Sequence, residues 1–486
     1  MTNKTYLIII ICVSLVTHFL FFGQPKETVF DEVHFGKFIS GYFTHEYFFD
    51  IHPPLGKLLI SGMGYLTNFE PGFSFAEIGQ QFPDRHYLWL RLLPILAGTL
   101  LPIVIFLLII RLGLSPLAAF TGGILISLDN ALIVQSRFIL LDPFLLLFGF
   151  AALLFYFIFK NRSSWRYLLM SGAAASLAIS VKWTGGTFLA LIIILYFISW
   201  LKSQNKIKDL IRGIVCLIIV PLILYFTIFA LHFSLLNKSG PGDAFMTPEF
   251  RKTLVGSNDN TNTLLRPLNI FQKFTELNIQ MYESNATLTA GHPYSSKWYT
   301  WPFMIRPIYY WNGSTVSTGS LQAGSPQDGS TRSTDSGQAD SPLDQSRIYL
   351  LGNPAIWWTS TVAILYLLLG LLHDLYKRAQ PKLIPELLIG AYLLNILPFI
   401  GISRAMFLYH YFIALLLAVI ALIYLLDQLP SSETPSAGSI RINKKRAFSA
   451  LLIASLAMFI FFAPLSYGRP LTEKAYHLRT WLGSWI

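Results

Sequence analysis

Long apolar runs separated by short polar connections constrain this chain more than any other feature. Runs of about 17 to 25 apolar residues, the length that crosses about 30 Å of hydrocarbon, give about eleven candidate helices. They lie near residues 6–22, 88–110, 116–134, 138–159, 167–181, 184–200, 213–234, 354–373, 384–402, 406–426 and 447–466. With 53% hydrophobic and 13% charged residues, the chain carries more apolar surface than a soluble domain buries. We therefore expect an all-α polytopic membrane protein.

The distribution of Lys and Arg predicts the orientation, because short basic loops stay in the cytoplasm. The connections on the side of the amino terminus carry Arg111; Lys160, Arg162 and Arg166; Lys202, Lys206, Lys208 and Arg212; Lys377, Arg378 and Lys382; and Arg441, Lys444, Lys445 and Arg446. We expect a cytoplasmic amino terminus and an outer carboxyl terminus. These loops account for much of the net charge of +11, so the bilayer is the expected partner and nucleic acid is not. Cys12 and Cys216, both in predicted helices, indicate neither a disulfide framework nor a Cys-based metal site.

This topology places two long segments outside, residues 23–87 and 235–353. In the first, Phe35, Phe38, Ile39, Tyr42 and Phe43 form the apolar face of a short helix, which we expect to lie on the membrane surface. Pro53 and Pro54 then predict the start of a second helix. In the second segment, residues 286–311 are rich in Trp and Tyr, which is typical of either an interfacial aromatic belt or a platform for sugar or peptide. Residues 313–346 are polar and are expected to be disordered.

Several ionisable residues at the outer ends of the predicted helices are not explained by topology. Intramembrane charges are costly and usually pair or contact a substrate. The carboxylates are Asp31, Glu32, Asp129 and Asp142, and the cations are Arg91, Arg137, Lys182 and Arg404. A structural Arg137–Asp142 salt bridge is an equally good explanation for that pair. His410 falls about one and a half turns after Arg404 and either is structural or contacts an anionic group.

An acidic pair opposite cations at the outer surface fits the transfer of a group from a lipid phosphate. Cations would hold the phosphate and stabilise the leaving charge, while a carboxylate takes the proton of an attacking hydroxyl. The sequence has no Gly-rich phosphate loop and no Asp-x-Asp pair of the kind that holds a metal against a nucleotide sugar. A lipid-linked donor is consistent with both observations.

A series of motifs resembles the protein O-mannosyltransferase family. They are Asp31-Glu32; Asp50-Ile51-His52-Pro53-Pro54-Leu55-Gly56-Lys57; Arg91-Leu92-Leu93-Pro94; Leu128-Asp129-Asn130 with Ser136-Arg137 and Leu141-Asp142; Ser180-Val181-Lys182-Trp183; His292 to Arg306; Leu351 to Trp358; and Arg404 to Tyr411. Each motif is a weak signal, but the series from residue 30 to residue 411 is specific.

The resemblance implies a GT-C glycosyltransferase fold and an inverting, metal-independent transfer of mannose from polyprenyl phosphate mannose to Ser or Thr of proteins, without a cofactor. By carry-over, Asp31 is the general base and Glu32 positions the acceptor or the base. The candidates for the donor phosphate are Arg91, Arg137, Lys182 and Arg404. The candidates for contacts to acceptor or sugar are His52, His292, Trp298 and His410.

We expect three parts: a catalytic membrane module at 1–234 that includes the outer loop 23–87, an outer loop at 235–353, and a four-helix module at 354–486. Eukaryotic members carry a β-trefoil domain in the large outer loop, and residues 235–353 are too short and too polar for one. The chain therefore resembles a bacterial-type member in the plasma membrane of a prokaryote. A dimer or an association with the secretion machinery stays open.

Two other functions remain open. An enzyme of the same fold would glycosylate a lipid or glycan instead of a protein, with the same donor and acid–base logic. A membrane transporter would place charged groups near the bilayer midplane on interrupted helices. Because the unexplained charges gather at one outer edge, the sequence favours the transferase.

Overall fold

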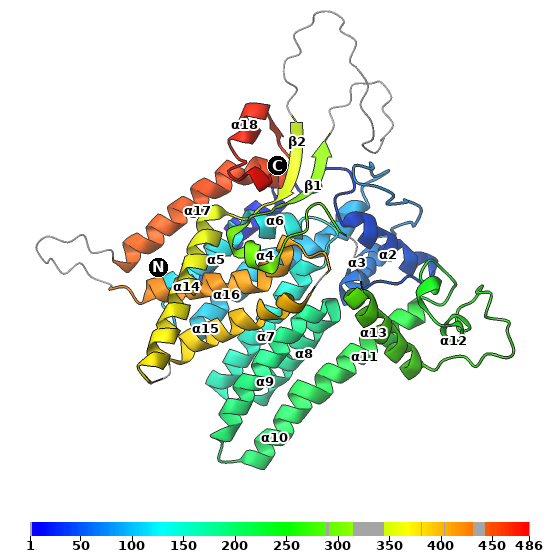
Figure 1. Cartoon of the computed structure of the whole chain (residues 1–486), viewed down its shortest axis with the longest axis horizontal. Coiled ribbons are helices and arrows are strands. Elements are labelled where there is room, and N and C mark those ends of the chain that lie inside the picture. The colour runs from blue at the N-terminus through cyan, green and yellow to red at the C-terminus, as the bar shows by residue number, and fades with distance from the viewer. Residues whose placement is uncertain are drawn as a thin grey trace, which may run out of the picture.

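The computed structural model is a bundle of long helices with a small sheet and short helices at one end (Figure 1). It describes residues 2–287, 291–313, 345–380, 382–402, 404–430 and 443–485. The helices are α1 (Asn3–Phe19), α2 (Glu32–Thr44), α3 (Leu55–Leu66), α4 (Tyr87–Arg111), α5 (Pro116–Ser127), α6 (Asn130–Ser136), α7 (Asp142–Arg162), α8 (Trp165–Val181), α9 (Gly186–Leu201), α10 (Lys206–Ile214), α11 (Val220–Leu235), α12 (Pro248–Arg251), α13 (Ile270–Thr287), α14 (Pro354–Tyr376), α15 (Leu383–Leu394), α16 (Phe412–Asp427), α17 (Lys444–Tyr467) and α18 (Glu473–His477).

Within the described residues, eight helical segments are long and apolar enough to cross a bilayer, or nine if the bent pair α5 and α6 is one span. They confirm a multi-pass membrane protein. All eleven predicted segments coincide with helices, but α1 and α8 have 17 residues each and fall short of that length. At 1.5 Å per residue such a helix covers about 25 Å. The expected count of eleven spans is thus higher than the structure supports by length and composition.

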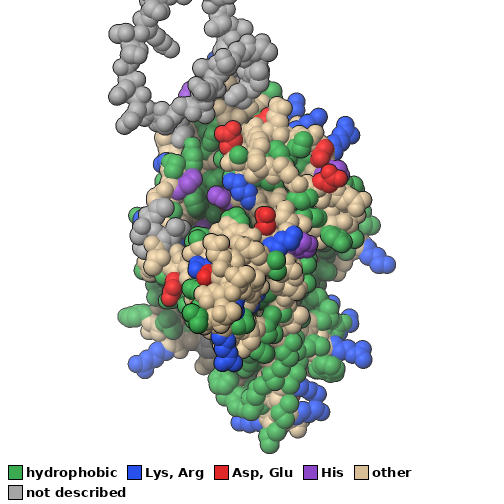
Figure 2. Space-filling view, turned by 90° about the vertical axis from the view of Figure 1, so that its right-hand side faces the viewer, with side chains coloured by type: hydrophobic (Ala, Val, Ile, Leu, Met, Phe, Trp, Pro, Cys, Tyr) green, Lys and Arg blue, Asp and Glu red, His purple; other side chains and the backbone are tan. Residues whose placement is uncertain are grey.

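The lipid-facing and protein-facing helices differ in what they expose. Helix α16 is buried along almost its whole length, whereas α9 and α11 expose Ile194, Phe197, Leu222 and Ile223. In Figure 2 the lower part of the molecule is largely hydrophobic, with Lys and Arg around it, and the visible acidic and His side chains lie higher. Exposed apolar side chains on long helices are what a lipid environment stabilises.

The break between α5 and α6 is produced by a buried carboxylate. The two helices meet at an angle of 58°. Asp129 caps the N-terminus of α6 by accepting a hydrogen bond from the backbone N–H of Leu132, and it accepts two more from the Asn353 N–H and the Trp357 indole. All three donors are buried, so Asp129 fixes α6 against the start of α14 and has a structural role.

Residues 23–87 contain the two short helices that the sequence predicts. Helix α2 buries Phe35, Ile39 and Tyr42 and packs on α3. Helix α3 begins directly after Pro54, where a missing backbone N–H does no harm. Lys57 in α3 forms an ion pair with Asp50 and donates to the carbonyl oxygens of His52 and Pro53, so it folds the connecting loop back on the helix.

Residues 235–353 supply two strands of a sheet that the sequence analysis did not predict, and the third strand lies near the carboxyl terminus. Strands β1 (Ile308–Gly313), β2 (Gln345–Leu350) and β3 (Pro470–Leu471) form an antiparallel sheet in the order β1-β2-β3. The register shifts between Tyr309 and Trp311, which marks a bulge in β1. The expected disorder of 313–346 is wrong at the two ends, which belong to strands, and otherwise lies outside the described residues.

Candidate active site

Two adjoining cavities open between α2, with the loop that follows it, and the helical bundle. The larger one has about 1450 Å³ of space and the smaller one about 540 Å³. Five residues line both: Ile51, His52, Arg404, Tyr409 and His410. The larger cavity also contains Asp31 and Asp50, and the smaller one contains Asp142 and Lys182. We describe the two cavities together as the cleft.

Asp31 lies at the turn into α2, on the wall of the cleft. Its side chain makes no hydrogen bond or ion pair with any described residue, and the residue is half-buried. Burial raises the pKa of Asp31 to about 7, and the Lys182 ammonium partly offsets that rise while Asp142 and Asp50 add to it. An unpartnered carboxylate with this pKa can accept a proton near neutral pH.

Glu32, the neighbour of Asp31, is buried and fully engaged. Its carboxylate accepts two hydrogen bonds from Arg91, at 2.7 Å from Nε and 2.6 Å from Nη2, and one each from the backbone N–H groups of Val29 and Ile139. Arg91 also donates to the carbonyl oxygens of Gly23, Pro25 and Glu27. Both side chains are completely buried. These contacts do not favour a phosphate role for Arg91, which stays a prediction, and they give Glu32 the part of fixing the segment that carries Asp31.

Arg137 is directed away from the cleft. It donates to the carbonyl oxygens of His18, Leu20 and Phe21 at the end of α1, and its guanidinium lies 4.7 Å from the ring centre of Tyr467. It forms no ion pair with Asp142, so the expected alternative of an Arg137–Asp142 bridge is wrong. Its predicted contact with the donor phosphate is untested, and this geometry does not favour it.

Asp142 instead pairs with Lys182 at the floor of the cleft. Lys182 Nζ lies 2.8 and 2.9 Å from the two carboxylate oxygens, and its ammonium lies 4.9 Å from the ring centre of Tyr409. Asp142 also accepts a hydrogen bond of 2.6 Å from Gln135, whose carbonyl accepts one of 2.5 Å from the Tyr310 hydroxyl. A chain of polar contacts therefore fixes the position of the Lys182 ammonium.

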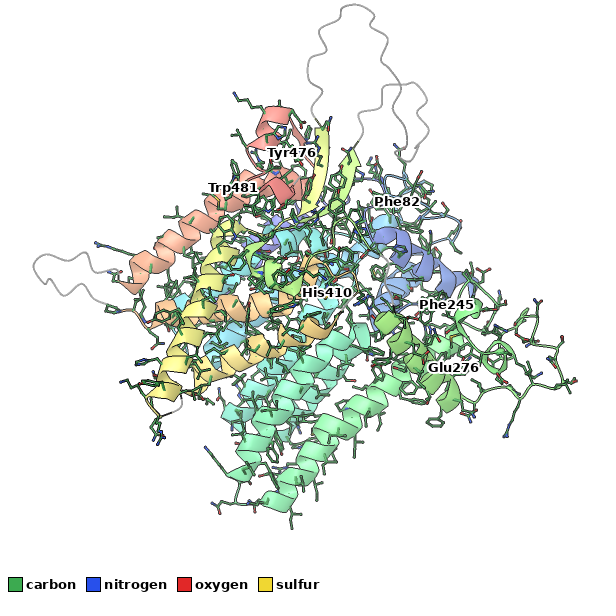
Figure 3. The ribbon with its side chains drawn as sticks, in the orientation of Figure 1. Phe82, Phe245, Glu276, His410, Tyr476 and Trp481 are labelled. Atoms are coloured by element: carbon green, nitrogen blue, oxygen red, sulfur yellow. The ribbon has the colours of Figure 1, made fainter. Side chains whose placement is uncertain are left out.

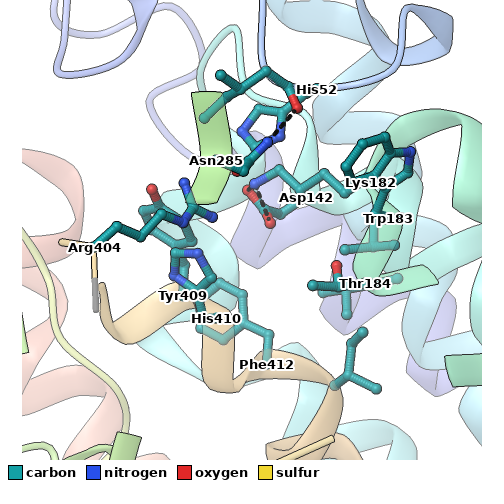
Figure 4. Close-up of a pocket in the computed structure, with 14 residues that line it drawn as sticks. His52, Asp142, Lys182, Trp183, Thr184, Asn285, Arg404, Tyr409, His410 and Phe412 are labelled. Carbon is teal, nitrogen blue, oxygen red and sulfur yellow. Dashed lines mark hydrogen bonds and ion pairs between the residues drawn. The ribbon is translucent and has the colours of Figure 1, made fainter. Parts of the chain in front are cut away.

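Arg404 and His52 complete the charged lining. Arg404 lies in the connection before α16 and makes no hydrogen bond or ion pair with a described residue. Burial lowers its pKa, and Tyr409 opposes that effect. Burial and the nearby cations hold the pKa of His52 well below its usual range, so this imidazole is neutral. Figure 4 shows Arg404 entering the cleft from one side and Lys182 with Asp142 from the other.

Of the other residues predicted to contact the acceptor or the sugar, two line the cleft and one does not. His410 lines the cleft, but it lies in a 3-10 turn (Leu408–Tyr411) and not on a continuous helix after Arg404 as expected. Its ring is stacked between Tyr409 and Trp301, at centroid distances of 4.8 and 5.8 Å. His292 lines the rim, where its ring contacts that of Phe407 at 5.0 Å. Trp298 is outside both cavities described here.

Four residues of the site were not among the predicted ones: Asp50, Gln135, Tyr310 and Tyr409. Asp50 stands in the quoted motif that ends at Lys57, and Tyr409 stands beside His410 in another, so adjacency was a usable signal. Gln135 and Tyr310 carry no charge, and only the fold brings them to Asp142. The arrangement as a whole places one free carboxylate in a cleft that two cations line, which suits proton removal beside an anionic group.

Comparison with protein families gives two matches that together cover most of the chain. Residues 8–237 match the model of dolichyl-phosphate-mannose-protein mannosyltransferase, and residues 270–485 match the C-terminal four-transmembrane region of protein O-mannosyltransferase. A dolichyl-phosphate-mannose–protein mannosyltransferase 4 of Candida albicans is 37% identical over 52% of this chain and 36% of its own length. A protein O-mannosyl-transferase 2 of Danio rerio is 32% identical over 61% of this chain and 40% of its own length. The chain thus matches less than half the length of these relatives.

Solved structures show the same fold. A chain of the Saccharomyces cerevisiae protein O-mannosyltransferase Pmt1–Pmt2 complex bound to the sugar donor superimposes with a TM-score of 0.85 at 20% identity, over 100% of this chain and 93% of that one. The archaeal oligosaccharyltransferase AglB of Archaeoglobus fulgidus gives a TM-score of 0.51 at 14% identity, over 99% of this chain and 57% of that one. The chain belongs to the protein O-mannosyltransferase family and has its GT-C type membrane fold.

Proposed function

We propose that this chain transfers mannose from a polyprenyl-phosphate donor to Ser or Thr hydroxyl groups of proteins. The observation that carries the proposal is the free carboxylate of Asp31 in a cleft lined by Arg404 and Lys182. The family membership supports the donor and acceptor classes, and the structure of the yeast complex was solved with its sugar donor bound.

In the proposed reaction Asp31 takes the proton of the acceptor hydroxyl as its oxygen attacks C1 of the sugar. The bond between C1 and the phosphate oxygen breaks, and the polyprenyl phosphate leaves with one additional negative charge. Attack from the face opposite the leaving group inverts the configuration at C1. Arg404 has no hydrogen-bond or ion-pair partner among the described residues, and Asp142 fixes the ammonium of Lys182 in the cleft. Both cations can therefore stabilise the leaving phosphate electrostatically.

We further propose that the cleft opens to the extracytoplasmic side. Helices α4 and α7 both begin at the cleft end, with Arg91 and Asp142, and both end in basic residues, Arg111 and Arg162. The basic ends of α4 and α7 therefore lie away from the cleft, in the pattern of cytoplasmic loops. The location in a prokaryotic plasma membrane stays a prediction, and the relatives named above are eukaryotic.

The direct test is transfer by the purified protein from polyprenyl-phosphate mannose to a peptide with a single Thr, with Asp31→Asn as the key variant. Loss of a general base lowers rates by about 10²- to 10⁴-fold. Because burial raises the pKa of Asp31, its charged form destabilises the fold at neutral pH, so Asn there should leave the melting temperature equal or higher. Glu77→Gln, an exposed change in the same outer segment, is the control.

If the Asp31→Asn variant turned over at close to the wild-type rate, Asp31 could not be the general base. The same assay with lipid-linked glucose or N-acetylglucosamine in place of mannose shows which sugar the protein transfers. Offering a glycan or lipid acceptor in place of the peptide tests the other acceptor classes.

A further inference from the structure

An open groove runs along the outer face of α13, beside the cleft. Its space is about 1050 Å³, and one wall consists of Gln272, Thr275, Glu276, Ile279, Gln280 and Glu283. These residues recur every three to four positions and so share one face of the helix. The facing wall includes Phe245 and Thr247. Figure 3 shows Phe245 and Glu276 together on the side of the molecule where α13 lies.

The groove is held open by contacts within the fold. The opposite face of α13 is packed inward, with Lys273, Leu277 and Met281 buried. Glu276 accepts hydrogen bonds of 2.8 and 2.9 Å from the backbone N–H and the hydroxyl of Thr247, which ties the two walls together. The groove is therefore a fixed feature of the surface.

The groove continues into the cleft at its upper end. Phe245 lines both, and its ring stacks at 4.4 Å on that of Phe49, which lines the cleft with Asp31. Ser284, the residue after Glu283, also lines the cleft. Asn285 donates a hydrogen bond of 3.1 Å to the carbonyl oxygen of Ile51 and fixes the end of α13 there. A molecule in the groove thus reaches the cleft without leaving the surface.

The lining identifies the class of occupant. The amides of Gln272 and Gln280 can bond a peptide backbone, and Phe245 and Ile279 offer apolar contact. Glu276 and Glu283 form no ion pair with a described residue, and no cation lines the groove. A polyprenyl chain would leave these polar groups without partners, and the carboxylates would repel an anionic polymer.

We propose that this groove binds the acceptor polypeptide and selects Lys or Arg near the modified hydroxyl. The proposal rests on the proposed function and names the part of the acceptor that this surface selects. Glu283 stands at the rim of the cleft, and Glu276 stands eight residues from Ser284, about 12 Å along the helix. An extended chain covers that distance with about four residues. The selected basic residues therefore lie within about four positions beyond the edge of the cleft.

The test compares acceptor peptides that share one Thr. Two Lys residues are placed before or after the Thr, at spacings that increase from four positions so that the length of the cleft is also covered, and matched peptides carry Glu or Gln there. One of the two Lys arrangements should lower KM for the peptide by about two- to five-fold per carboxylate relative to Gln, as expected for exposed ion pairs. The Glu peptide should raise KM, and both differences should shrink with added salt.

The matched variants are Glu283→Gln alone and together with Glu276→Gln, with Glu77→Gln as the control outside the groove. In the groove variants the ratio of kcat/KM between Lys and Gln peptides should fall toward one, while the control keeps the wild-type ratio. The Glu283 side chain forms no hydrogen bond with a described residue, so Glu283→Gln separates charge selection from any loosening of the Thr247 contact.

Equal KM values for Lys, Gln and Glu peptides with the wild-type protein would overturn the inference while leaving the transfer reaction intact. A Lys preference that survives both groove variants would also overturn it, because the selection would then arise elsewhere. If the wild-type protein glycosylates none of the peptides, the proposed function itself fails.

Discussion

The protonation of one side chain, Asp31, should set the pH range in which the protein works. Its pKa of about 7 means that the carboxyl is largely protonated below that pH and cannot accept the acceptor's proton. We therefore expect kcat/KM to fall about tenfold per unit as the pH drops below about 7 and to level off above it. The lowered pKa of His52 keeps that imidazole neutral near pH 7.

The measurement is a profile of kcat/KM for the peptide from pH 5 to 9, with the peptide well below its KM, since this quantity reports groups of the enzyme before the peptide binds. A flat profile between pH 5 and 7 would contradict the raised pKa and the role of Asp31. The residual rate of the Asp31→Asn variant provides the control, because it should lose this pH dependence.

Replacement of Lys182 and replacement of Arg137 should have different effects, although both residues lie at helix ends. Lys182 lines the cleft, so Lys182→Gln should weaken the contact with the donor phosphate by about 10- to 100-fold in kcat/KM for the donor. Arg137 donates to three carbonyl oxygens at the end of α1, so Arg137→Gln should lower the free energy of unfolding by about 1–3 kcal/mol.

Donor titration and thermal unfolding in detergent distinguish the two variants. The surviving Arg137→Gln protein should keep the wild-type donor KM. A raised donor KM in that variant, at unchanged stability, would restore the phosphate role that the sequence predicts for Arg137.

The sequence located the charged residues of the site but not their partners. Asp31, Lys182, Arg404 and His410 were named from their placement, and all line the cleft. The same reasoning also predicted that Arg91 and Arg137 contact the donor phosphate. In the sequence, a cation at a helix end that points into a cleft cannot be distinguished from one that binds backbone carbonyl groups. Only three-dimensional contacts make that distinction.

At the level of elements, a single ion pair fixes α2 on α4. Glu32 and Arg91 are completely buried and joined by two hydrogen bonds. Breaking such a pair by removing one charge leaves the other unpaired, which destabilises a protein by about 3–5 kcal/mol. We expect Glu32→Gln to lower the melting temperature and, because Glu32 also holds Val29 and Ile139, to displace Asp31 and lower kcat.

Thermal unfolding and kcat measured on the same preparation check this prediction. Glu77→Gln, a change to an exposed carboxylate between α3 and α4, is a suitable comparison. Normal stability together with reduced turnover in Glu32→Gln would contradict the fixing role and favour a direct contact with the acceptor.

Element prediction succeeded where one physical signal dominates. Apolar length located every helix long and apolar enough to cross a bilayer, and an apolar face with the prolines before α3 located α2 and α3. The 18-residue helix α13 was not predicted, because it is largely polar and carries no apolar run. The sheet was missed because 31 mostly polar residues separate β1 from β2 and because β3 is only two residues long. Pairing between segments so far apart is not visible in local periodicity.

At the level of the whole molecule, the cleft and the basic ends of α4 and α7 lie on opposite sides, which gives a sharp test of orientation. Lys37 on α2 is exposed near the cleft, and Lys208 on α10 is exposed near the basic ends. With Cys12 and Cys216 replaced by Ser, a membrane-impermeant maleimide applied to intact cells should label Lys37→Cys and leave Lys208→Cys unlabelled. Both should react after permeabilisation. Labelling of Lys208→Cys alone in intact cells would place the cleft in the cytoplasm, where a donor presented on the outer leaflet could not reach Asp31.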